Sequence, residues 1–359
     1  MTTLAGILRV EDLTPITEIP TVDLTTAVNA LLARYQQERD EATALFVQET
    51  TTRRTEKIAQ GGVDEGQVLG PDGRPLETRP AGMVEVGYPW DRYGWAFGGN
   101  SETAAAMTVA DTQRSVNSII GGNAKRHMRE INRAFWNNAN YTYEEEQNLY
   151  GDSGTLTVRR LANSDGSLFA PTNNADTEAD DNHYLVSGYL ASAISPTNNP
   201  FVTLAAEIRE HFDSEAPIVA FINSAQRNQV LTGLTNFVDA DVEGVIRGVN
   251  ADRAQDLGVT VPGDFLGIDQ DSGVYVYVWG RTPATYIDAF AVGQPAPLKR
   301  RVPLLTALQG LKLEAEEDHD PMWKRTYRER FGYGVANRLS AAVMQLKASG
   351  TYDVPTVYA

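Results

Sequence analysis

Residues 323–346 read W-K-R-T-Y-R-E-R-F-G-Y-G-V-A-N-R-L-S-A-A-V-M-Q-L, and the acidic run L-K-L-E-A-E-E at 311–317 precedes them across a short turn. Apolar side chains recur with a period of two and one gap, as in a half-buried strand, at Tyr327, Phe331, Tyr333 and Val335. The acidic arm carries Glu314, Glu316 and Glu317, and the basic arm answers with Lys324, Arg325, Arg328 and Arg330. Opposite charges across a hairpin fix its register, although each pair contributes only about 0.2–1 kcal/mol. The stretch therefore predicts a long, charge-matched β-hairpin.

The composition limits the function classes that the chain can serve. Its 359 residues are 42% hydrophobic, and 31 basic against 47 acidic residues give a net charge of −16. A protein that coats DNA by neutralising phosphates needs the opposite sign. The absence of cysteine excludes a disulfide scaffold, a thiolate zinc site and a cysteine nucleophile. The N-terminus lacks the pattern of a signal peptide, and the longest uncharged window, 184–206, is polar and contains two prolines, so we expect a soluble protein with no membrane partner.

The first hundred residues predict an arm, a helix and a long hairpin. Residues 1–48 combine an extended arm with an amphipathic helix that starts at Asp23 and reaches about Gln48. This helix packs either on the core of its own chain or on a neighbouring subunit. Within 49–99, two strand-like arms at 49–60 and 83–97 flank a glycine- and proline-rich turn region, which gives a hairpin on the order of 50 Å long. Because an isolated two-stranded ribbon is marginal in water, we expect it to lie on another copy of the chain.

The remaining residues predict two mixed units, so the fold class is α+β. Residues 100–212 begin with a helix to about Asn137, with Gly121-Gly122 as a candidate kink, and continue into a β-rich segment. Residues 213–308 form an α/β unit with a buried strand at 216–222, a helix capped by Asn223 or Ser224, and strands at 265–268, 273–279 and 285–292. Residues 309–359 return to the second unit as the hairpin and a C-terminal tail.

No sequence motif points to an enzyme. The phosphate-loop, hydrolase-elbow and zincin motifs are absent, and the glycines at 332 and 334 are best explained by backbone packing. The stretch from Asp239 imitates the start of a calcium loop, but its twelfth position is Asn250 instead of a bidentate glutamate. The four histidines, His127, His183, His211 and His319, are each isolated from other good ligands at metal spacing. We therefore expect no catalytic residue, no metal and no cofactor.

The pattern R-x-R-F-G-x-G-V-x-N-R at 328–338 resembles the C-terminal part of tailed-bacteriophage major capsid proteins with the Hong Kong 97 fold. The resemblance covers nearly the whole chain. It implies an N-terminal arm with a helix at 1–48, an extended β-hairpin loop at 49–99, a peripheral domain with a long spine helix at 100–212, an α/β axial domain at 213–308, and peripheral-domain return strands with a tail at 309–359.

The resemblance also implies a function. Such a protein self-assembles into pentamers and hexamers of an icosahedral head that encloses double-stranded DNA without sequence-specific binding. It is found in the virion after assembly in the host bacterial cytoplasm, and its expected partners are itself, a portal protein, a separate scaffolding protein and a decoration protein. Because only about 48 residues precede the expected loop, we expect the mature subunit to keep its N-terminus.

Intersubunit contacts are expected in two places. Arginines of the hairpin can form bidentate pairs with carboxylates on neighbours, and two tryptophans accompany them. These residues are Arg53, Arg54, Arg74, Arg79, Trp90 and Trp95. The family resemblance places the turn of the C-terminal hairpin at three-fold axes, with Asp318, Asp320, Met322 and Trp323 at the contact. Lys57 is the only lysine among residues 1–124 and lies near the base of the expected hairpin, so we expect non-covalent contacts.

Two other functions stay open at this point. An encapsulin-like nanocompartment shell would use the same fold around a cargo enzyme, and neighbouring genes for a portal and terminase, or for a cargo enzyme, would separate the two. A soluble enzyme with an unfamiliar site is the third reading, and a monodisperse monomer in light scattering would favour it.

Overall fold

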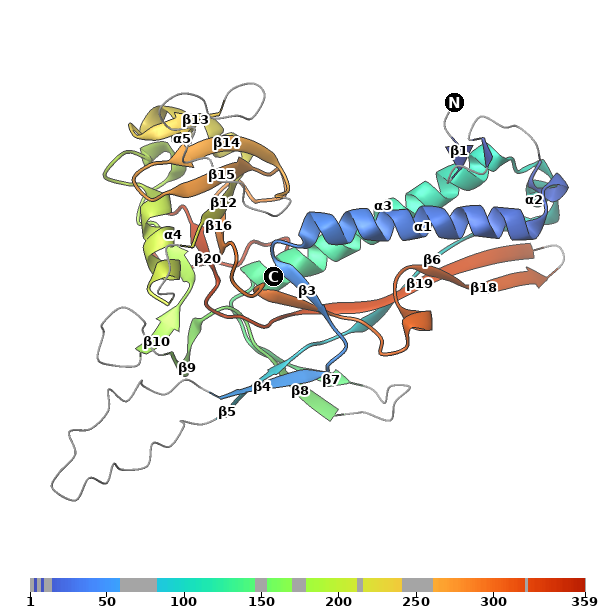
Figure 1. Ribbon diagram of the computed structural model, residues 1–359, viewed down its shortest axis with the longest axis horizontal. Helices are drawn as coiled ribbons and strands as arrows, with labels where there is room; N and C mark the ends of the chain where they lie inside the picture. Colours follow the sequence, from blue (N-terminus) through green and yellow to red (C-terminus); the bar gives the residue numbers. More distant parts are fainter. Residues whose placement is uncertain are drawn as a thin grey trace, which may run out of the picture.

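The computed structural model describes residues 3–4, 8–9, 15–58, 83–145, 154–169, 179–211, 216–240, 261–319 and 322–358. A block built on a large sheet lies at one end, and two long helices with a long sheet extend from it (Figure 1). The helices are α1 Thr21–Thr43, α2 Ser101–Ala106, α3 Val109–Trp136, α4 Pro200–Arg209 and α5 Arg227–Gly233. Among the described residues, no helix combines the length and hydropathy that crossing a membrane requires.

The block at one end is organised by a seven-stranded mixed sheet in the order β11-β20-β16-β12-β15-β14-β13. Its strands are β11 Tyr184–Val186, β12 Ile218–Ile222, β13 Phe237–Asp239, β14 Asp264–Asp269, β15 Val274–Val278, β16 Tyr286–Ala291 and β20 Ala341–Gln345. Every residue of β12 is buried, because alternate side chains enter the apolar clusters on the two faces of the sheet. The unbroken apolar run in the sequence predicted this central strand, and the expected strands around it are confirmed.

The limits of this sheet differ from the predicted unit at 213–308. The edge strand β11 and the strand β20 lie outside those limits but belong to the sheet, and β11 pairs with β20 in parallel. The strand β17 Leu298–Arg301 lies inside the limits but pairs with another sheet. The strand pairings join distant parts of the chain, which local sequence patterns do not encode.

The second sheet is built around β19 Met322–Val335, which has β18 Lys312–His319 and β6 Asp91–Asn100 as antiparallel neighbours. The other end of β19 pairs with β17, and β17 pairs in parallel with β3 Val47–Thr50. The predicted hairpin of β18 and β19 is confirmed, and its register places Leu313 opposite Tyr327. The strand β6 corrects the prediction for 83–97, because the second arm of the expected long hairpin divides and its C-terminal part joins β19.

The helices α1 and α3 run side by side over this second sheet (Figure 1). A small apolar cluster joins them to the sheet, formed by Val28, Leu32, Val116, Ile119, Leu311 and Tyr327. The helix α1 therefore packs on its own chain. Its N-cap is Pro20, three residues before the predicted start at Asp23. Asp23 lies in the first turn, where the helix dipole favours a negative charge. It ends at Thr43, before the predicted limit at Gln48.

The predicted helix at 100–137 is confirmed, with one interruption in a different place. The chain breaks between α2 and α3, where Thr108 and Asp111 form a capping box at the start of α3. The helix α3 continues without interruption through Gly121-Gly122, the candidate kink. A Cβ atom on Gly122 would lie 2.9 Å from Nε1 of Trp95, so this glycine makes room for a side chain of β6.

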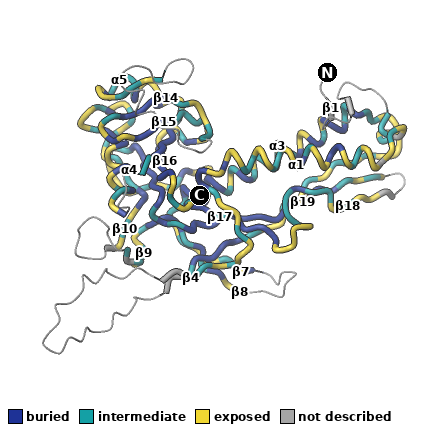
Figure 2. The backbone as a smooth tube through the Cα atoms, in the orientation of Figure 1, coloured by how far each residue is buried: buried dark blue, intermediate teal, exposed yellow. Residues whose placement is uncertain are grey.

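Short ribbons complete the fold. They are β1 Thr3–Leu4 with β2 Leu8–Arg9, β4 Arg54–Ile58 with β5 Met83–Gly87, β7 Tyr141–Glu145 with β8 Gly154–Val158, and β9 Asn163–Phe169 with β10 Ala179–Asn182. The predicted β-rich segment after the long helix is confirmed by the last two pairs. Figure 2 shows that buried residues concentrate in the large sheet and along the inner faces of α3 and β19.

Candidate subunit contacts and buried ionic sites

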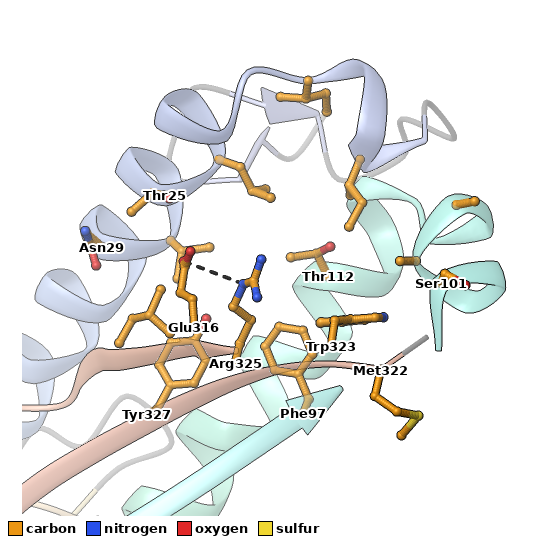
Figure 3. Close-up of a pocket in the computed structure, with 17 residues that line it drawn as sticks. Thr25, Asn29, Phe97, Ser101, Thr112, Glu316, Met322, Trp323, Arg325 and Tyr327 are labelled. Atoms are coloured by element: carbon orange, nitrogen blue, oxygen red, sulfur yellow. Dashed lines mark ion pairs between the residues drawn. The ribbon is translucent and has the colours of Figure 1, made fainter. Parts of the chain in front are cut away.

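The end of the β18–β19 hairpin borders an open cavity of about 520 Å³ (Figure 3). Its walls come from α1, the segment before it, α2, and the ends of β6, β18 and β19. The aromatic rings of Phe97, Trp323 and Tyr327 line it, and the ring of Phe97 meets Trp323 edge-on at 5.6 Å between centroids. Met322 lies at its edge and is 59% exposed.

Trp323 has partners within its own chain. Its Nε1 donates to the carbonyl of Asn100 at 3.1 Å, and the Arg325 guanidinium lies 5.8 Å from its ring centroid. Asp318 is opposite Trp323 in the strand register. Asp320 lies outside the described residues. Among the described residues of the tip, Met322 offers an exposed apolar side chain at the edge of the cavity.

The cross-strand charges of the hairpin pair as the sequence predicted. Glu314 accepts hydrogen bonds from Arg330 and from Arg328, the latter at 3.4 Å, and the pKa of Glu314 is held below its ordinary value mainly by the Arg330 bond. Arg325 lies 3.6 Å from Glu316 in a more exposed pair. The two pairs differ in burial, so they should differ in strength.

The hairpin arginines are placed differently from one another. Arg53 donates to Glu145 at 2.6 Å, and Arg301 donates to the other oxygen of that carboxylate at 2.7 Å, so Arg53 belongs to an ion triad within its own chain. Arg54 lies on β4 with a half-exposed side chain whose Nη1 is 3.6 Å from Glu85. Arg74 and Arg79 lie outside the described residues.

The two predicted tryptophans also have partners inside the chain. The guanidinium of Arg301 lies 4.7 Å from the ring centroid of Trp90, a cation–π geometry. Trp95 packs against the cluster between the helices and the second sheet and over Gly122. Neither residue is fully buried, so an additional contact with a neighbouring subunit remains a prediction for both.

A buried hydrogen-bond network joins α1, α3 and β19. The carboxylate of Glu329 accepts from Arg39 at 2.9 Å, from Asn123 at 2.6 Å and lies 2.9 Å from Nε2 of His127. Burial would raise the pKa of Glu329, but its hydrogen bonds and the charges facing it lower that pKa to about 2. Burial lowers the pKa of His127 to about 4, so this imidazole is neutral at pH 7. The prediction that His127 is isolated is therefore wrong.

A second ionic cluster adjoins the first at the base of α1. Arg300 of β17 donates to both oxygens of Asp40, at 2.6 and 3.0 Å, and also to Glu49. Burial opposes the charge of Arg300, but these carboxylates raise its pKa well above the ordinary value. A bidentate arginine pair here fixes the helix against the second sheet.

Two further histidines come together on a third cluster. Nε2 of His183 and Nε2 of His211 lie 2.8 and 2.7 Å from the same carboxylate oxygen, Oδ2 of Asp181. Their isolation along the sequence is thus a wrong prediction. The sequence signals were present as D-N-H at 181–183, where alternate strand residues share a face, and E-I-R-E-H at 207–211, where helix residues three and four apart share a face. The calcium-like stretch after Asp239 lies mainly outside the described residues.

Comparison with solved structures finds the same fold in a chain from Mycobacterium phage Patience. The TM-score is 0.67 at 19% identity, and the match covers 96% of this chain and 94% of that one. The capsid of a native GTA particle matches with a TM-score of 0.49 at 12% identity over 86% and 91% of the two chains. The holo-SrpI encapsulin complex from Synechococcus elongatus matches with a TM-score of 0.39 at 9% identity over 88% and 90%. No family model and no curated protein sequence matches the chain. The predicted resemblance to a phage capsid protein is confirmed at the level of the fold.

Proposed function

We propose that this chain is the major capsid protein of a tailed bacteriophage and has the Hong Kong 97 fold. The observation that carries the proposal is the shared fold with a phage protein along almost the full length of both chains. In this assignment the seven-stranded sheet is the axial domain, α3 is the spine helix, and β18 and β19 are the long strands of the peripheral domain. The protein acts by assembly and has no enzymatic role.

The proposed assembly consists of pentamers and hexamers that close into an icosahedral shell around double-stranded DNA. A net charge of −16 suits a shell that must enclose DNA without adhering to it. The shell forms in the host cytoplasm and becomes part of the virion, with a portal protein, a separate scaffolding protein and a decoration protein as the partners to look for.

Electron microscopy of the purified, concentrated protein tests this function. Closed shells that contain DNA when purified from infected or induced cells support it. Shells that contain a cargo enzyme and no DNA favour the encapsulin-like alternative. A monodisperse particle with the mass of one chain in light scattering, under every assembly condition tried, contradicts both shell functions.

The β4–β5 ribbon and the residues that continue it are the proposed strap between subunits. The ribbon projects from the edge of the molecule, and Arg54 is half exposed on it (Figure 1). Removal of 61–79 should leave a folded protein that fails to make shells, as judged by circular dichroism and electron microscopy. A deletion variant that assembles as well as the parent would show that the strap is wrong.

The proposed contact at the hairpin tip depends chiefly on Met322. Met322 is 59% exposed, whereas Trp323 has partners in its own chain. Met322→Ser therefore tests the contact between capsomers separately from packing within the subunit. We expect Met322→Ser to weaken joints between capsomers without changing the stability of the free subunit. Trp323→Ala should weaken both, by about 2 kcal/mol or more for a fully desolvated contact. Equal shell stability for the parent and Met322→Ser in a denaturant series would show that the hairpin tip does not contribute to the joints between capsomers.

A further inference from the structure

The carboxylate of Asp181 lies between two imidazoles in the block that contains the seven-stranded sheet. Asp181 ends the β9–β10 ribbon, His183 leads into β11, and His211 follows α4. The rings of the two histidines stack with 5.2 Å between centroids, and His183 is fully buried. Glu207 and Glu210 of the same helix end complete the group. Two sets of three ligand atoms, Asp181 with the two histidines and Asp181 with the two glutamates, each lie within 4.8 Å of one another.

The position of His183 is fixed before any ligand arrives. Its backbone amide donates to Ala162, and its backbone carbonyl accepts from Val343, both at 2.8 Å. Its Nδ1 lies 2.6 Å from the carbonyl of Ala341, an acceptor, so Nδ1 carries a proton and donates it. In the neutral imidazole, Nε2 then presents a lone pair toward Asp181. A backbone carbonyl on one ring nitrogen is the arrangement that orients metal-binding histidines in proteins.

One ring nitrogen of His183 has no hydrogen-bond partner in the group. Among the described residues, Nε2 of His183 is buried and has no hydrogen-bond partner of acceptable geometry, although Oδ2 of Asp181 is only 2.8 Å away. A lone pair and a carboxylate oxygen at this distance repel each other unless a cation lies between them. His211 brings a second imidazole nitrogen to the same oxygen at 2.7 Å. The group therefore brings together several atoms that can act as metal ligands, more than a single proton could bridge.

We propose that Asp181, His183 and His211, with Glu207 or Glu210 as a fourth ligand, bind one divalent transition-metal ion of the zinc type. Two imidazoles and two carboxylates suit Zn²⁺, whereas Mg²⁺ and Ca²⁺ prefer oxygen ligands throughout. Bonds of about 2.0–2.2 Å in a tetrahedral site place ligand atoms roughly 3.3 Å apart, so binding requires the cluster to open by about half an ångström. The ion would link the β9–β10 ribbon to α4 and to the edge of the large sheet.

The contacts around the site agree with this assignment. Ligand oxygens of Glu207 and Glu210 lie within 4.8 Å of each other and of an oxygen of Asp181. His211 and Glu210 also approach each other, with 3.4 Å between Nε2 and Oε1. The expected role is structural, because the ligands are contributed by three elements and His183 has no exposed surface.

The full-length protein is stripped with EDTA, dialysed into zinc-buffered solution, and measured for metal by mass spectrometry and for melting temperature. We expect one Zn²⁺ per chain, a melting temperature several degrees higher than that of the stripped protein, and, after Co²⁺ loading, the visible absorption of a tetrahedral site. His211→Asn and Asp181→Asn should each weaken Zn²⁺ binding by at least about 100-fold, since loss of a supporting hydrogen bond alone typically costs 10–100-fold.

The matched control is His319→Ala, which removes a histidine at the far end of β18, opposite the cluster in Figure 1. It should bind Zn²⁺ like the parent. If a ligand variant fails to fold, the zinc stoichiometry and the Co²⁺ absorption spectrum of the parent protein still test the site. A parent that retains no zinc at micromolar free ion, or His211→Asn that binds as well as His319→Ala, would overturn the site.

Discussion

The sheet around β12 buries apolar side chains on both faces, whereas the layer of α1, α3 and β19 buries ions and hydrogen bonds beside a smaller apolar cluster. Non-directional apolar contacts tolerate small shifts between elements, but the bonds to Glu329 and Arg300 have fixed lengths and angles. Replacing such buried ions by apolar groups is often neutral for stability, so their use here points to a different advantage. We infer that they fix the position of the long helices on the sheet, which the proposed assembly into a shell would require.

The largest expected effect is in the block with the large sheet. Phe221 of β12 is fully buried, and its ring lies 5.3 Å from that of Trp279 and 5.8 Å from that of Phe290. Phe221→Ala should lower the free energy of unfolding by about 3–5 kcal/mol, because it removes buried surface and leaves a cavity. Denaturant unfolding of the unassembled chain measures this. Val202→Ala on the exposed side of α4 is the control and should change stability little.

The second effect is in the layer of the long helices. Glu329→Ala removes the common acceptor of Arg39, Asn123 and His127 and leaves a buried arginine without its carboxylate. We expect a loss of about 3 kcal/mol in the same unfolding experiment. Glu41→Ala, on the exposed face of α1, provides the control. A Glu329→Ala protein as stable as this control would show that the network contributes nothing to holding the layer together.

The third expected effect is a pH dependence of the free energy of unfolding that originates in the layer of the long helices. The pKa of His127 falls to about 4 in the folded chain, while an unfolded histidine titrates near 6.5. Between these values the unfolded state binds a proton that the folded state does not, so stability rises with pH across this window and is lost as pH falls. Glu329, with its pKa lowered to about 2, extends the loss below roughly pH 4.

We expect a decrease on the order of 2 kcal/mol between about pH 6.5 and 4, measured by denaturant unfolding at each pH. His127→Asn should flatten the dependence in that window, while His319→Ala should keep it. The same slope in the parent and in His127→Asn would mean that other groups cause the acid sensitivity.

Local patterns predicted the elements better than their partners. The apolar run of β12 and the alternation in β19 each predict a strand, because burial on one or both faces constrains which residue types can occupy these positions. The partner of a strand is not encoded in this way. The sequence therefore predicts a hairpin with β4 for β6, which in fact pairs with β19, and a unit at 213–308 that excludes β11 and β20.

The buried polar sites were missed for a related reason. His127 and Glu329 are 202 positions apart, and His211 meets Asp181 across 30 positions. Spacing within one element could have marked half of each site, but only the fold brings the halves together. Among the proposed contact residues whose side chains the structure describes, Met322 and Arg54 are exposed, in agreement with the sequence argument, whereas Arg53 and Trp323 have partners inside the chain.

The smallest expected effects lie within the β18–β19 hairpin, where the contrast between the regions recurs on a small scale. Glu314 accepts from two arginines and its side chain is 20% exposed, whereas Glu316 faces only the longer 3.6 Å approach of Arg325 and is 40% exposed. Glu314→Gln should cost about 1 kcal/mol and Glu316→Gln less than about 0.5 kcal/mol. Salt near 1 M shortens the screening length to about 3 Å and should remove the second effect before the first. Equal costs that vanish together in salt would mean that both pairs behave as solvated surface charges.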